Sequence, residues 1–443
     1  MTGLVRFHTA LQREEERRLA LFATRSDEAT RRLTEDEDEH DLRLAYQRDR
    51  DRILHARAFR RLKHKTQVFV PHVGDHPRTR LTHTLEVSQL ARTLARSLGL
   101  NEDLAEAASL GHDLGHTAFG HTGETVLDAI LGGDNPDILL PPEVVAGAGR
   151  FKHNYQSLRV VDLFERRYAH AGINLTDQVR EAILKHTSWK VNFAFPLPDA
   201  DGLSLDTPCH LEGQAVAVAD EIAQQTHDLE DGLRAKSVAL DEVEELGVAA
   251  HVMNEIGPRY GEQRPWDRQN TLVRNLIRLF VIDVVQTSAG RIERFCDRRD
   301  ISDHVGWRQH AREVSQTTLW FSTKMEELFA ELKSFIYARI INQAPVSRQD
   351  WRARRVMTAL FEAYWREPAV LPDYILLRAH EEVGLPYLRD LPLKRVATVV
   401  GERYHACPGF ARLIVDHLAG MSDRFALEEF RALQLPSPDQ EIG

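Results

Sequence analysis

The chain carries, from position 111 to position 124, the stretch Gly111-His112-Asp113-Leu114-Gly115-His116-Thr117-Ala118-Phe119-Gly120-His121-Thr122-Gly123-Glu124. It ends an alanine-rich segment in which Asn101 predicts the N-cap of a helix over 102–114, with Gly115 and Gly120 as breaks after that helix. His112 and Asp113 are adjacent, and neighbouring helical residues point about 100° apart, so both can touch one ion only over the helix flank. Small neighbouring residues leave room for this approach. The stretch therefore predicts a metal site built on helices.

Two further candidate ligands lie far from this stretch. His83 stands in Arg80-Leu81-Thr82-His83-Thr84, at the start of a predicted helix over 81–98. Asp220 stands in the apolar run 214–223, where an aspartate without a cation beside it would bear a large desolvation cost. A lone histidine or His–Asp pair on a helix is more often an ordinary hydrogen-bonded group. Together, two imidazoles and two carboxylates suit Mn²⁺, Fe²⁺, Zn²⁺ or Mg²⁺, with positions left for water and a phosphate oxygen.

Composition limits the classes of function. The 443 residues are 42% hydrophobic and carry a net charge of −10, so a substantial core is expected and a dedicated nucleic-acid coat protein is disfavoured. No uncharged apolar run has the length of a transmembrane helix, and the N-terminus lacks the apolar region of a signal peptide. The three cysteines, Cys209, Cys296 and Cys407, are far apart and fit a reducing cytoplasm, which is the location we expect.

Apolar residues recur at three- and four-residue spacing along most of the chain, which predicts an all-α fold. We expect one mostly helical unit over 1–443, with a metal-binding core over 78–231 and a C-terminal helical extension over 238–435. Pro71–Arg80 and the Gly- and Pro-rich segment 131–150 predict loops. The expected helices cover 41–66, 81–98, 102–114, 154–168, 176–186, 211–229, 272–288, 315–341, 352–365 and 396–415.

Longer motifs carry a family resemblance. They are Arg60-Arg61-Leu62-Lys63-His64-Lys65-Thr66-Gln67-Val68-Phe69, Arg78-Thr79-Arg80-Leu81-Thr82-His83-Thr84-Leu85-Glu86-Val87, the stretch 111–124, and Thr226-His227-Asp228-Leu229-Glu230-Asp231-Gly232-Leu233. With the order His…His-Asp…Asp, they resemble the HD-domain metal-dependent phosphohydrolases and, among these, the bacterial dGTP triphosphohydrolase family. The resemblance is strongest over 49–234. It implies an HD-domain helical core, N- and C-terminal helical extensions, and one divalent ion (Mg²⁺, Mn²⁺ or a similar transition metal) held by His83, His112, Asp113 and Asp220.

The resemblance also implies catalytic residues. His121 and Glu124 match a pair that supplies acid–base chemistry, and their three-residue spacing lets the carboxylate accept an imidazole N–H. His116 matches a phosphate-contacting histidine, and His153 matches a further active-site histidine.

A second group of residues is implied in substrate binding. Arg80 is expected to bind phosphate oxygens, with Lys152 as a cation beside His153 and Lys185 as a weaker candidate. Gln224 and Asp228 lie four and eight residues after Asp220, at offsets where related enzymes bind the sugar. Two positions depart from the family pattern, because Gln224 stands where relatives usually have Tyr and Lys63 where many have Gln. The preferred base and sugar are therefore left open.

The reaction implied is metal-dependent hydrolysis of dNTPs, either dGTP or several of them, to deoxynucleoside and tripolyphosphate, which would control the dNTP pool. Two alternatives stay open: an HD phosphodiesterase acting on another nucleotide, and a nucleotide-sensing or nucleic-acid-binding regulator. The resemblance also implies a homo-oligomer, from a dimer of paired subunits up to a hexamer, and allows a dNTP activator. No membrane association is expected. Nucleic acid is not an expected partner, because no aromatic–basic interleaving accompanies the many arginines.

Overall fold

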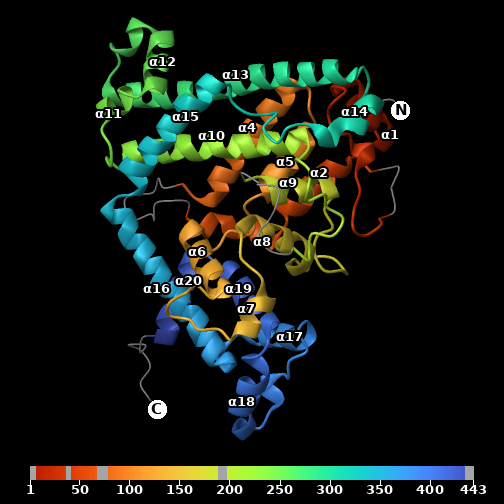
Figure 1. Cartoon of the computed structure of the whole chain (residues 1–443), viewed down its shortest axis with the longest axis vertical. Helices are drawn as coiled ribbons and strands as arrows, with labels where there is room; N and C mark the ends of the chain where they lie inside the picture. The colour runs from red at the N-terminus through yellow and green to blue at the C-terminus, as the bar shows by residue number, and fades with distance from the viewer. Residues whose placement is uncertain (1–5, 36–40, 67–77, 188–196, 435–443) are drawn as a thin grey trace.

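The computed structural model describes residues 6–35, 41–66, 78–187 and 197–434, and over these ranges the fold is all-α, as predicted. The described backbone contains α-helices, short 3₁₀ and π turns and isolated bridges, but no strand. Figure 1 shows an upper layer of long helices that includes α10 and α13, and a lower lobe into which α16 descends. None of the described helices combines the length and the apolar character that a bilayer crossing would require.

The first half of the chain contributes α1 (His8–Arg18), α2 (Ala45–Leu54), α3 (Arg57–Arg61), α4 (Arg80–Leu98), α5 (Glu102–Gly111), α6 (Gly120–Gly132), α7 (Pro142–Ala148), α8 (His153–Arg159), α9 (Asp177–Lys185) and α10 (Leu211–Arg234). The second half contributes α11 (Leu240–Glu244), α12 (Gly247–Ile256), α13 (Pro265–Arg299), α14 (His304–His310), α15 (Thr323–Ile336), α16 (Ala344–Arg366), α17 (Asp373–Glu381), α18 (Leu393–Val399), α19 (Pro408–Ala419) and α20 (Asp423–Gln434).

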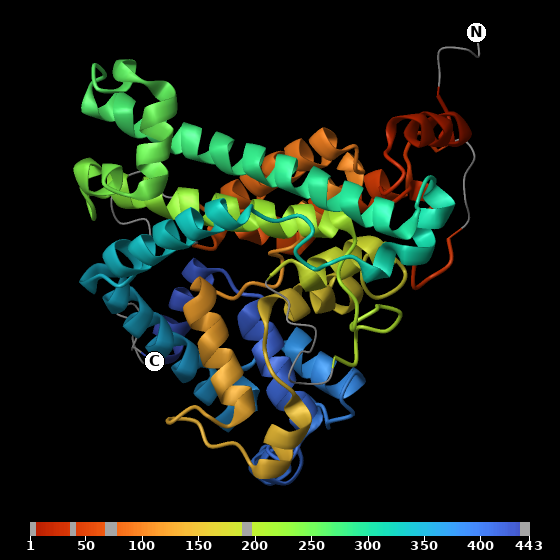
Figure 2. The ribbon, with the colours of Figure 1, turned by 45° about the horizontal axis from the view of Figure 1, so that its top comes forward.

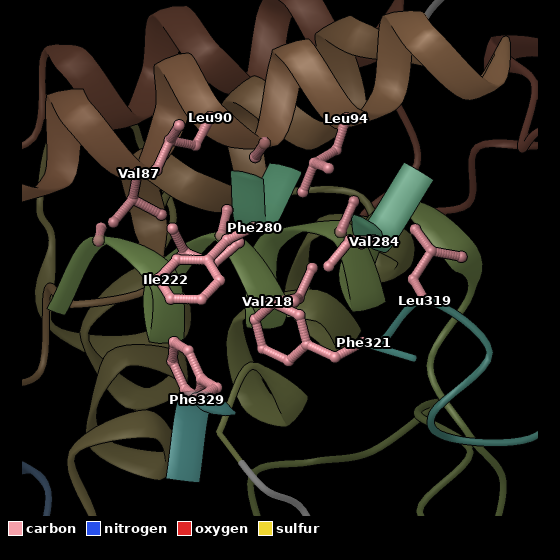
Figure 3. Packing of buried hydrophobic residues seen from close by; sticks show 14 of the residues in the cluster. Val87, Leu90, Leu94, Val218, Ile222, Phe280, Val284, Leu319, Phe321 and Phe329 are labelled. Atoms are coloured by element: carbon pink, nitrogen blue, oxygen red, sulfur yellow. The ribbon is translucent and has the colours of Figure 1, made fainter. Parts of the chain in front are cut away.

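The largest hydrophobic core lies in the upper layer, around α10. Val218 and Ile222 of α10 pack with Leu90 of α4 and with Phe280 of α13, as Figure 3 shows. These apolar positions recur at the spacing of one helix face, and each fully buried side chain of this size contributes about 1.5–3 kcal/mol. The core therefore fixes α4 against α10, the two helices that carry His83 and Asp220.

Two further cores complete the fold. One joins α2, α5, α8 and α9, with Leu110 of α5 and Ile183 of α9 among its members. The other joins α6 and α7 to α16, α17 and α19, so that Ile130 and Phe361 belong to the same cluster. Figure 2 shows α6 lying beside these C-terminal helices. Part of the predicted core 78–231 is thus packed directly on the predicted extension 238–435.

Some predicted helices have the wrong bounds. The segment 41–66 is not one helix, because the carboxylate of Glu165 accepts from the backbone amides of Arg57 and Ala58 and so caps a new helix, α3. The segment 396–415 is also divided, since α19 begins at Pro408 after a π turn over 400–404.

Other differences concern the predicted loops and helix ends. The segment 131–150 is not a continuous loop: it contains the end of α6 and the short helix α7, whose first residue is Pro142. The helix predicted over 102–114 ends at Gly111, and the one over 154–168 ends in a π turn at Phe164. Most of the predicted loop 71–80 lies outside the described residues. Of the expected ends, Asn101 does cap α5 and Gly99, at φ 68°, does end α4.

Candidate active site

The His-Asp turn is held by close backbone packing at Gly115. A Cβ atom at Gly115 would lie 2.1 Å from the backbone nitrogen of Ser157 and 2.3 Å from the carbonyl oxygen of His153. The Gly115 N–H donates to Ser157 Oγ at 2.8 Å, and Ser157 Oγ–H donates to the carbonyl of His112 at 2.7 Å. The absence of a side chain at Gly115 therefore lets α8 approach the turn that carries His112 and Asp113.

Three of the four predicted metal ligands form one group. The candidate ligand atoms of His83, His112 and Asp220 all lie within 4.8 Å of one another. His83 Nε2 is 2.9 Å from Asp220 Oδ1, and His112 Nε2 is 3.6 Å from the same oxygen. The fourth predicted ligand, Asp113, is adjacent: its Oδ1 lies 3.5 Å from His112 Nε2, and its Oδ2 accepts from Arg80 at 2.7 Å. The structure thus contains a His/Asp group with the donor types that hold a divalent ion.

The hydrogen bonds of the two histidines fit a metal site. His112 Nδ1 is 2.6 Å from the carbonyl oxygen of Ser109. Because a carbonyl oxygen can only accept, Nδ1 carries a proton, so in the neutral ring Nε2 presents a lone pair. That Nε2 is buried and has no hydrogen-bond partner among the described residues. A ring nitrogen buried against two carboxylates is a place that either a proton or a metal ion can fill.

His83 is oriented in the same sense by two residues behind it. Its Nδ1 lies 3.4 Å from Nδ1 of His227, and Nε2 of His227 contacts Glu86 Oε2 at 2.5 Å. The Glu86 carboxylate favours a proton on Nε2 of His227, which leaves Nδ1 of His227 free to accept from Nδ1–H of His83. Because the Asp220 carboxylate can only accept, Nε2–H of His83 donates to it at 2.9 Å, and an ion bound by Nε2 would take the place of that proton.

The electrostatics of this group favour a cation. Burial lowers the pKa of His112, but Asp113 and Asp220 outweigh it and raise that pKa to about 9. Burial raises the pKa values of both aspartates, yet His112 and Arg80 hold the pKa of Asp113, and hydrogen bonds from His112 and His83 hold that of Asp220, well below the usual range. Both carboxylates are thus ionised at neutral pH, and a metal ion would compete with the proton on His112.

The predicted catalytic residues form a neighbouring group. His116, His121, Glu124 and His153 have candidate ligand atoms within 4.8 Å of one another. Glu124 Oε2 lies 2.8 Å from His153 Nδ1 but 3.6 Å from His121 Nδ1, so its nearest imidazole is His153, although the spacing in the sequence favours His121. The rings of His116 and His153 stack with centroids 3.9 Å apart. Burial and the nearby positive groups, Arg80 first, lower the pKa of His116 well below its usual value, so its imidazole is neutral.

Members of both groups line one cavity of about 190 Å³. Its lining includes Arg80, His83, Asp113, His116, His121, His153, His186, Thr187, Asp220, Glu221 and Gln224. The Nε atom of buried Arg80 has no partner among the described residues, so the guanidinium has a donor to spare beside its bond to Asp113. Gln224 also lines the cavity, at the position predicted to face the sugar.

The remaining predicted substrate residues lie elsewhere. Lys185 is fully buried, and its ammonium donates to Glu181 Oε1 at 2.8 Å and to the carbonyls of Ser204 and Thr207, so the structure commits it to packing and does not bring it to the cavity. Lys152 is half-exposed, with Nζ 3.5 Å from Glu124 Oε1.

Asp228 and Lys63 do not line the cavity either. Asp228 is buried outside the lining, and its burial raises its pKa to about 8. Lys63 is exposed on the 3₁₀ turn that follows α3. The sugar and base preferences associated with Asp228 and Lys63 stay predictions.

Sequence reasoning missed three residues of the site. His186, at the end of α9, lines the cavity, while Glu86 and His227 orient His83 from behind. In the sequence, His227 stands out only as part of a family motif, and His186 only as the neighbour of Lys185. The sequence signal that could have identified His186 is its position at the end of a helix. It follows Ile183 by three residues, and Ile183 belongs to the apolar face that packs on α5.

Comparisons with known proteins agree with this geometry. The HD domain family matches residues 80–224, and the phosphohydrolase-associated domain family matches residues 319–384. The fold and the His/Asp group define an HD-domain phosphohydrolase.

Relatives place the chain more closely. The deoxyguanosinetriphosphate triphosphohydrolase-like protein of Bordetella pertussis is 39% identical over 393 residues, which cover 88% of this chain and 90% of that protein. Proteins of the same name from Bartonella henselae and Geobacter metallireducens are 38% and 37% identical, covering 88% and 96% of this chain and 90% and 97% of their own length. The chain belongs to the family of deoxyguanosinetriphosphate triphosphohydrolase-like proteins.

Proposed function

We propose that the protein hydrolyses deoxynucleoside triphosphates to deoxynucleoside and tripolyphosphate, with a divalent metal ion bound by His83, His112, Asp113 and Asp220. One observation carries the proposal: His83 and Asp220 of the candidate metal group, the buried Arg80 with its spare donor, and the histidines His116, His121 and His153 line one cavity. When bound, the ion would supply Lewis acidity to an α-phosphoryl oxygen. The positive charges of the ion and of Arg80 would offset the negative charge of a triphosphate, which Asp113 and Asp220 alone would repel.

Phosphate binding is assigned to Arg80 and His116. Arg80 would turn its free donor to the phosphate oxygens, where a guanidinium fork forms charge-assisted hydrogen bonds. His116 is buried, and its Nδ1 has no partner among the described residues. In the neutral tautomer that carries its one proton on Nδ1, His116 would donate a hydrogen bond to a phosphoryl oxygen without bringing a further charge into the cavity.

Acid–base chemistry is assigned to the pair of His121 and Glu124, with His153 beside it. His121 is largely exposed and lies in the first turn of α6, with its Nδ1 3.6 Å from the buried carboxylate of Glu124. Burial raises the pKa of Glu124, but His153 and His121 outweigh it and hold that pKa well below its usual range, so the carboxylate stays ionised. An ionised Glu124 stabilises a proton on His121, which would be passed to the departing 5′-oxygen.

The phosphorus products of the reaction identify the bond that is cleaved. Purified protein is incubated with each of the four dNTPs, singly and mixed, in Mg²⁺, Mn²⁺ or Co²⁺, and the phosphorus products are resolved. We expect tripolyphosphate and deoxynucleoside, and no turnover in His112→Ala or Asp113→Ala. His251→Ala, on the distant helix α12, serves as the matched histidine control and should keep the wild-type rate.

Other products would reject the proposal. Release of inorganic phosphate, pyrophosphate or a monophosphate would favour another HD phosphohydrolase activity, such as a phosphodiesterase. Nucleotide binding with no hydrolysis in any metal would favour the sensor. Full activity in either ligand variant would remove the assigned metal centre.

A further inference from the structure

A carboxylate of the C-terminal extension binds two segments that carry or adjoin proposed active-site residues. Asp423, the first residue of α20, is partly buried, and both of its oxygens accept hydrogen bonds. Oδ1 accepts from the backbone amide of Phe119 at 2.9 Å. Oδ2 accepts from the backbone amide of Thr66 at 2.9 Å and also from the Thr66 hydroxyl. One side chain therefore joins two parts of the chain that lie far from it in the sequence.

The first segment is the turn 116–119, which leads into α6. Phe119 is the N-cap of α6 and has a φ of 62°, in the left-handed region that residues with a side chain rarely adopt. Such a conformation persists only where the surroundings hold it. His121 and Glu124 follow in the first turns of α6. The backbone of Phe119 therefore sets the start of the helix that carries the proposed acid–base pair.

The second segment is 65–66, which pairs with the residues before α4. The carbonyl oxygen of Lys65 accepts from the backbone amide of Arg80 at 3.1 Å. The buried ammonium of Lys65 donates to the carbonyl oxygen of His116 and, at 2.9 Å, to that of Ala419. The segment is thus bonded both to the residue proposed to bind phosphate and to the turn before α6.

We infer that Asp423 is a positioning residue, which holds the phosphate-binding side and the acid–base side of the proposed active site in a fixed arrangement. Its effect on catalysis rests on the proposed function. Asp423 does not line the cavity, so it acts through Thr66 on one side and through Phe119 on the other. A carboxylate suits this role because it only accepts, and the three groups bonded to it are all donors.

Other contacts of α6 do not replace this carboxylate. Thr122 Oγ1 donates to Asp350 of α16 at 2.6 Å, and the apolar face of α6 packs in the C-terminal core. These contacts fix the body of the helix, because they involve side chains beyond its first residues. The backbone amide of Phe119 is held by the bond to Asp423. Without that bond, the turn before α6 can relax although the helix stays in place.

The two sides of the site should respond differently to the loss of Asp423. Arg80 has a second support, since its guanidinium donates to Asp113 at 2.7 Å. The largely exposed side chain of His121 has no comparable anchor, because its Nδ1 is 3.6 Å from Glu124. The loss of Asp423 should therefore displace His121 more than Arg80, and lower kcat more than it changes KM.

Amide hydrogen exchange tests the positioning without a nucleotide. In Asp423→Ala, the Phe119 amide, followed by mass spectrometry on peptides that cover 116–124, should exchange about 10–100-fold faster than in wild type, because it loses a bond to a charged acceptor. Asp303→Ala is the matched control. Asp303 Oδ1 accepts from the backbone amide of Gly306 at 2.8 Å at the start of α14, a helix that contributes no residue to the cavity. This variant should leave exchange over 116–124 unchanged.

Steady-state kinetics test the consequence for catalysis. In Asp423→Ala, kcat for dNTP hydrolysis should fall about 10–100-fold, with KM within about threefold of wild type and bound Mn²⁺ unchanged. Asp423→Asn keeps the shape of the side chain but has one acceptor oxygen in place of two. It can therefore serve only one of the two segments, and its kcat should lie between those of wild type and Asp423→Ala. Asp303→Ala should keep the wild-type kcat.

The two measurements together decide the inference. Wild-type exchange over 116–124 in folded Asp423→Ala would overturn it, and so would faster exchange with a wild-type kcat, which would leave Asp423 a purely structural residue. Should the alanine variant not fold, a wild-type kcat in Asp423→Asn has the same meaning. A wild-type protein that hydrolyses no dNTP refutes the proposed function, whereas the exchange rates still decide whether Asp423 holds the turn.

Discussion

Replacing Gly115 by alanine tests whether the active site depends on backbone contact between the His-Asp turn and α8. The added methyl carbon would lie 2.1 Å from Ser157 N, 2.3 Å from His153 O and 2.4 Å from Gln156 C, all of which are backbone atoms of α8. A flexible side chain could move away from such a contact by itself, but a backbone atom cannot move without its helix. The substitution must therefore displace either the turn or the whole of α8.

The magnitude depends on the contacts that this shift would break. Overpacking of this kind costs about 1–3 kcal/mol. The bond from Gly115 N to Ser157 Oγ and the bond from Ser157 Oγ to His112 O would weaken together, at about 1 kcal/mol each. Alanine also lowers the conformational entropy of the unfolded chain, which offsets about 0.4–1 kcal/mol of this destabilisation. The free energy of unfolding should therefore fall by about 2–5 kcal/mol.

Urea denaturation followed by circular dichroism measures this change, with Gly401→Ala as the matched control. Gly401 lies in the π turn before α19 and has no atom within 4 Å of its Cβ position, so its substitution should leave stability within about 1 kcal/mol of wild type. Since the shift moves His112 away from His153, we also expect kcat/KM to fall about 100-fold. A folded Gly115→Ala protein with wild-type stability and activity would refute the close approach.

Three further predictions address single side chains. His121→Ala should lower kcat about 10²–10⁴-fold while bound Mn²⁺ stays at the wild-type level, because the role proposed for His121 is to supply a proton and not a ligand atom; loss of the metal would contradict that role. Glu86→Gln should weaken Mn²⁺ binding about 10–100-fold by loosening the orientation of His83, with kcat at saturating Mn²⁺ little changed, as a metal titration would report. Burial, then Arg61 and Arg80, lower the pKa of Lys65 to about 7 in the folded protein. Between about pH 7 and 10, Lys65 is therefore protonated in the unfolded chain but largely neutral in the folded protein. Stability should rise with pH over this window in wild type by up to about 1.4 kcal/mol per pH unit relative to Lys65→Met, and parallel pH profiles in urea denaturation would contradict it.

The sequence is informative about helices whose ends carry local signals. Asn101 and Gly99 mark real helix ends because a cap satisfies backbone groups within a few residues. The break between α2 and α3 has no such signal, since the capping carboxylate, Glu165, lies more than a hundred residues away. The missed helix α7 has one, because Pro142 is favoured at a first helical position, but the surrounding Gly and Pro residues favour a loop.

The residue types of the candidate metal group were predictable, but the orientation of their side chains was not. The order His…His-Asp…Asp selects the residues of this group, and three of them meet as expected. The ring orientations of His112 and His186 depend on the carbonyl oxygens of Ser109 and Ile183, which bind their Nδ1 atoms. The directions of these carbonyls are set by where the two helices end, which the sequence does not specify.

The pair Lys185-His186 shows why His186 was not identified from the sequence as a residue of the cavity. A lysine near a phosphate site is the obvious cation, so the sequence favours Lys185 over its neighbour. Neighbouring residues of a helix point about 100° apart, so when Lys185 turns toward Glu181 and the carbonyls of 204 and 207, His186 must point elsewhere. It points to His153. The choice between the two is made by the packing of α9 on α5 through Ile183 and Gly111, a contact between segments that the sequence alone does not bring together.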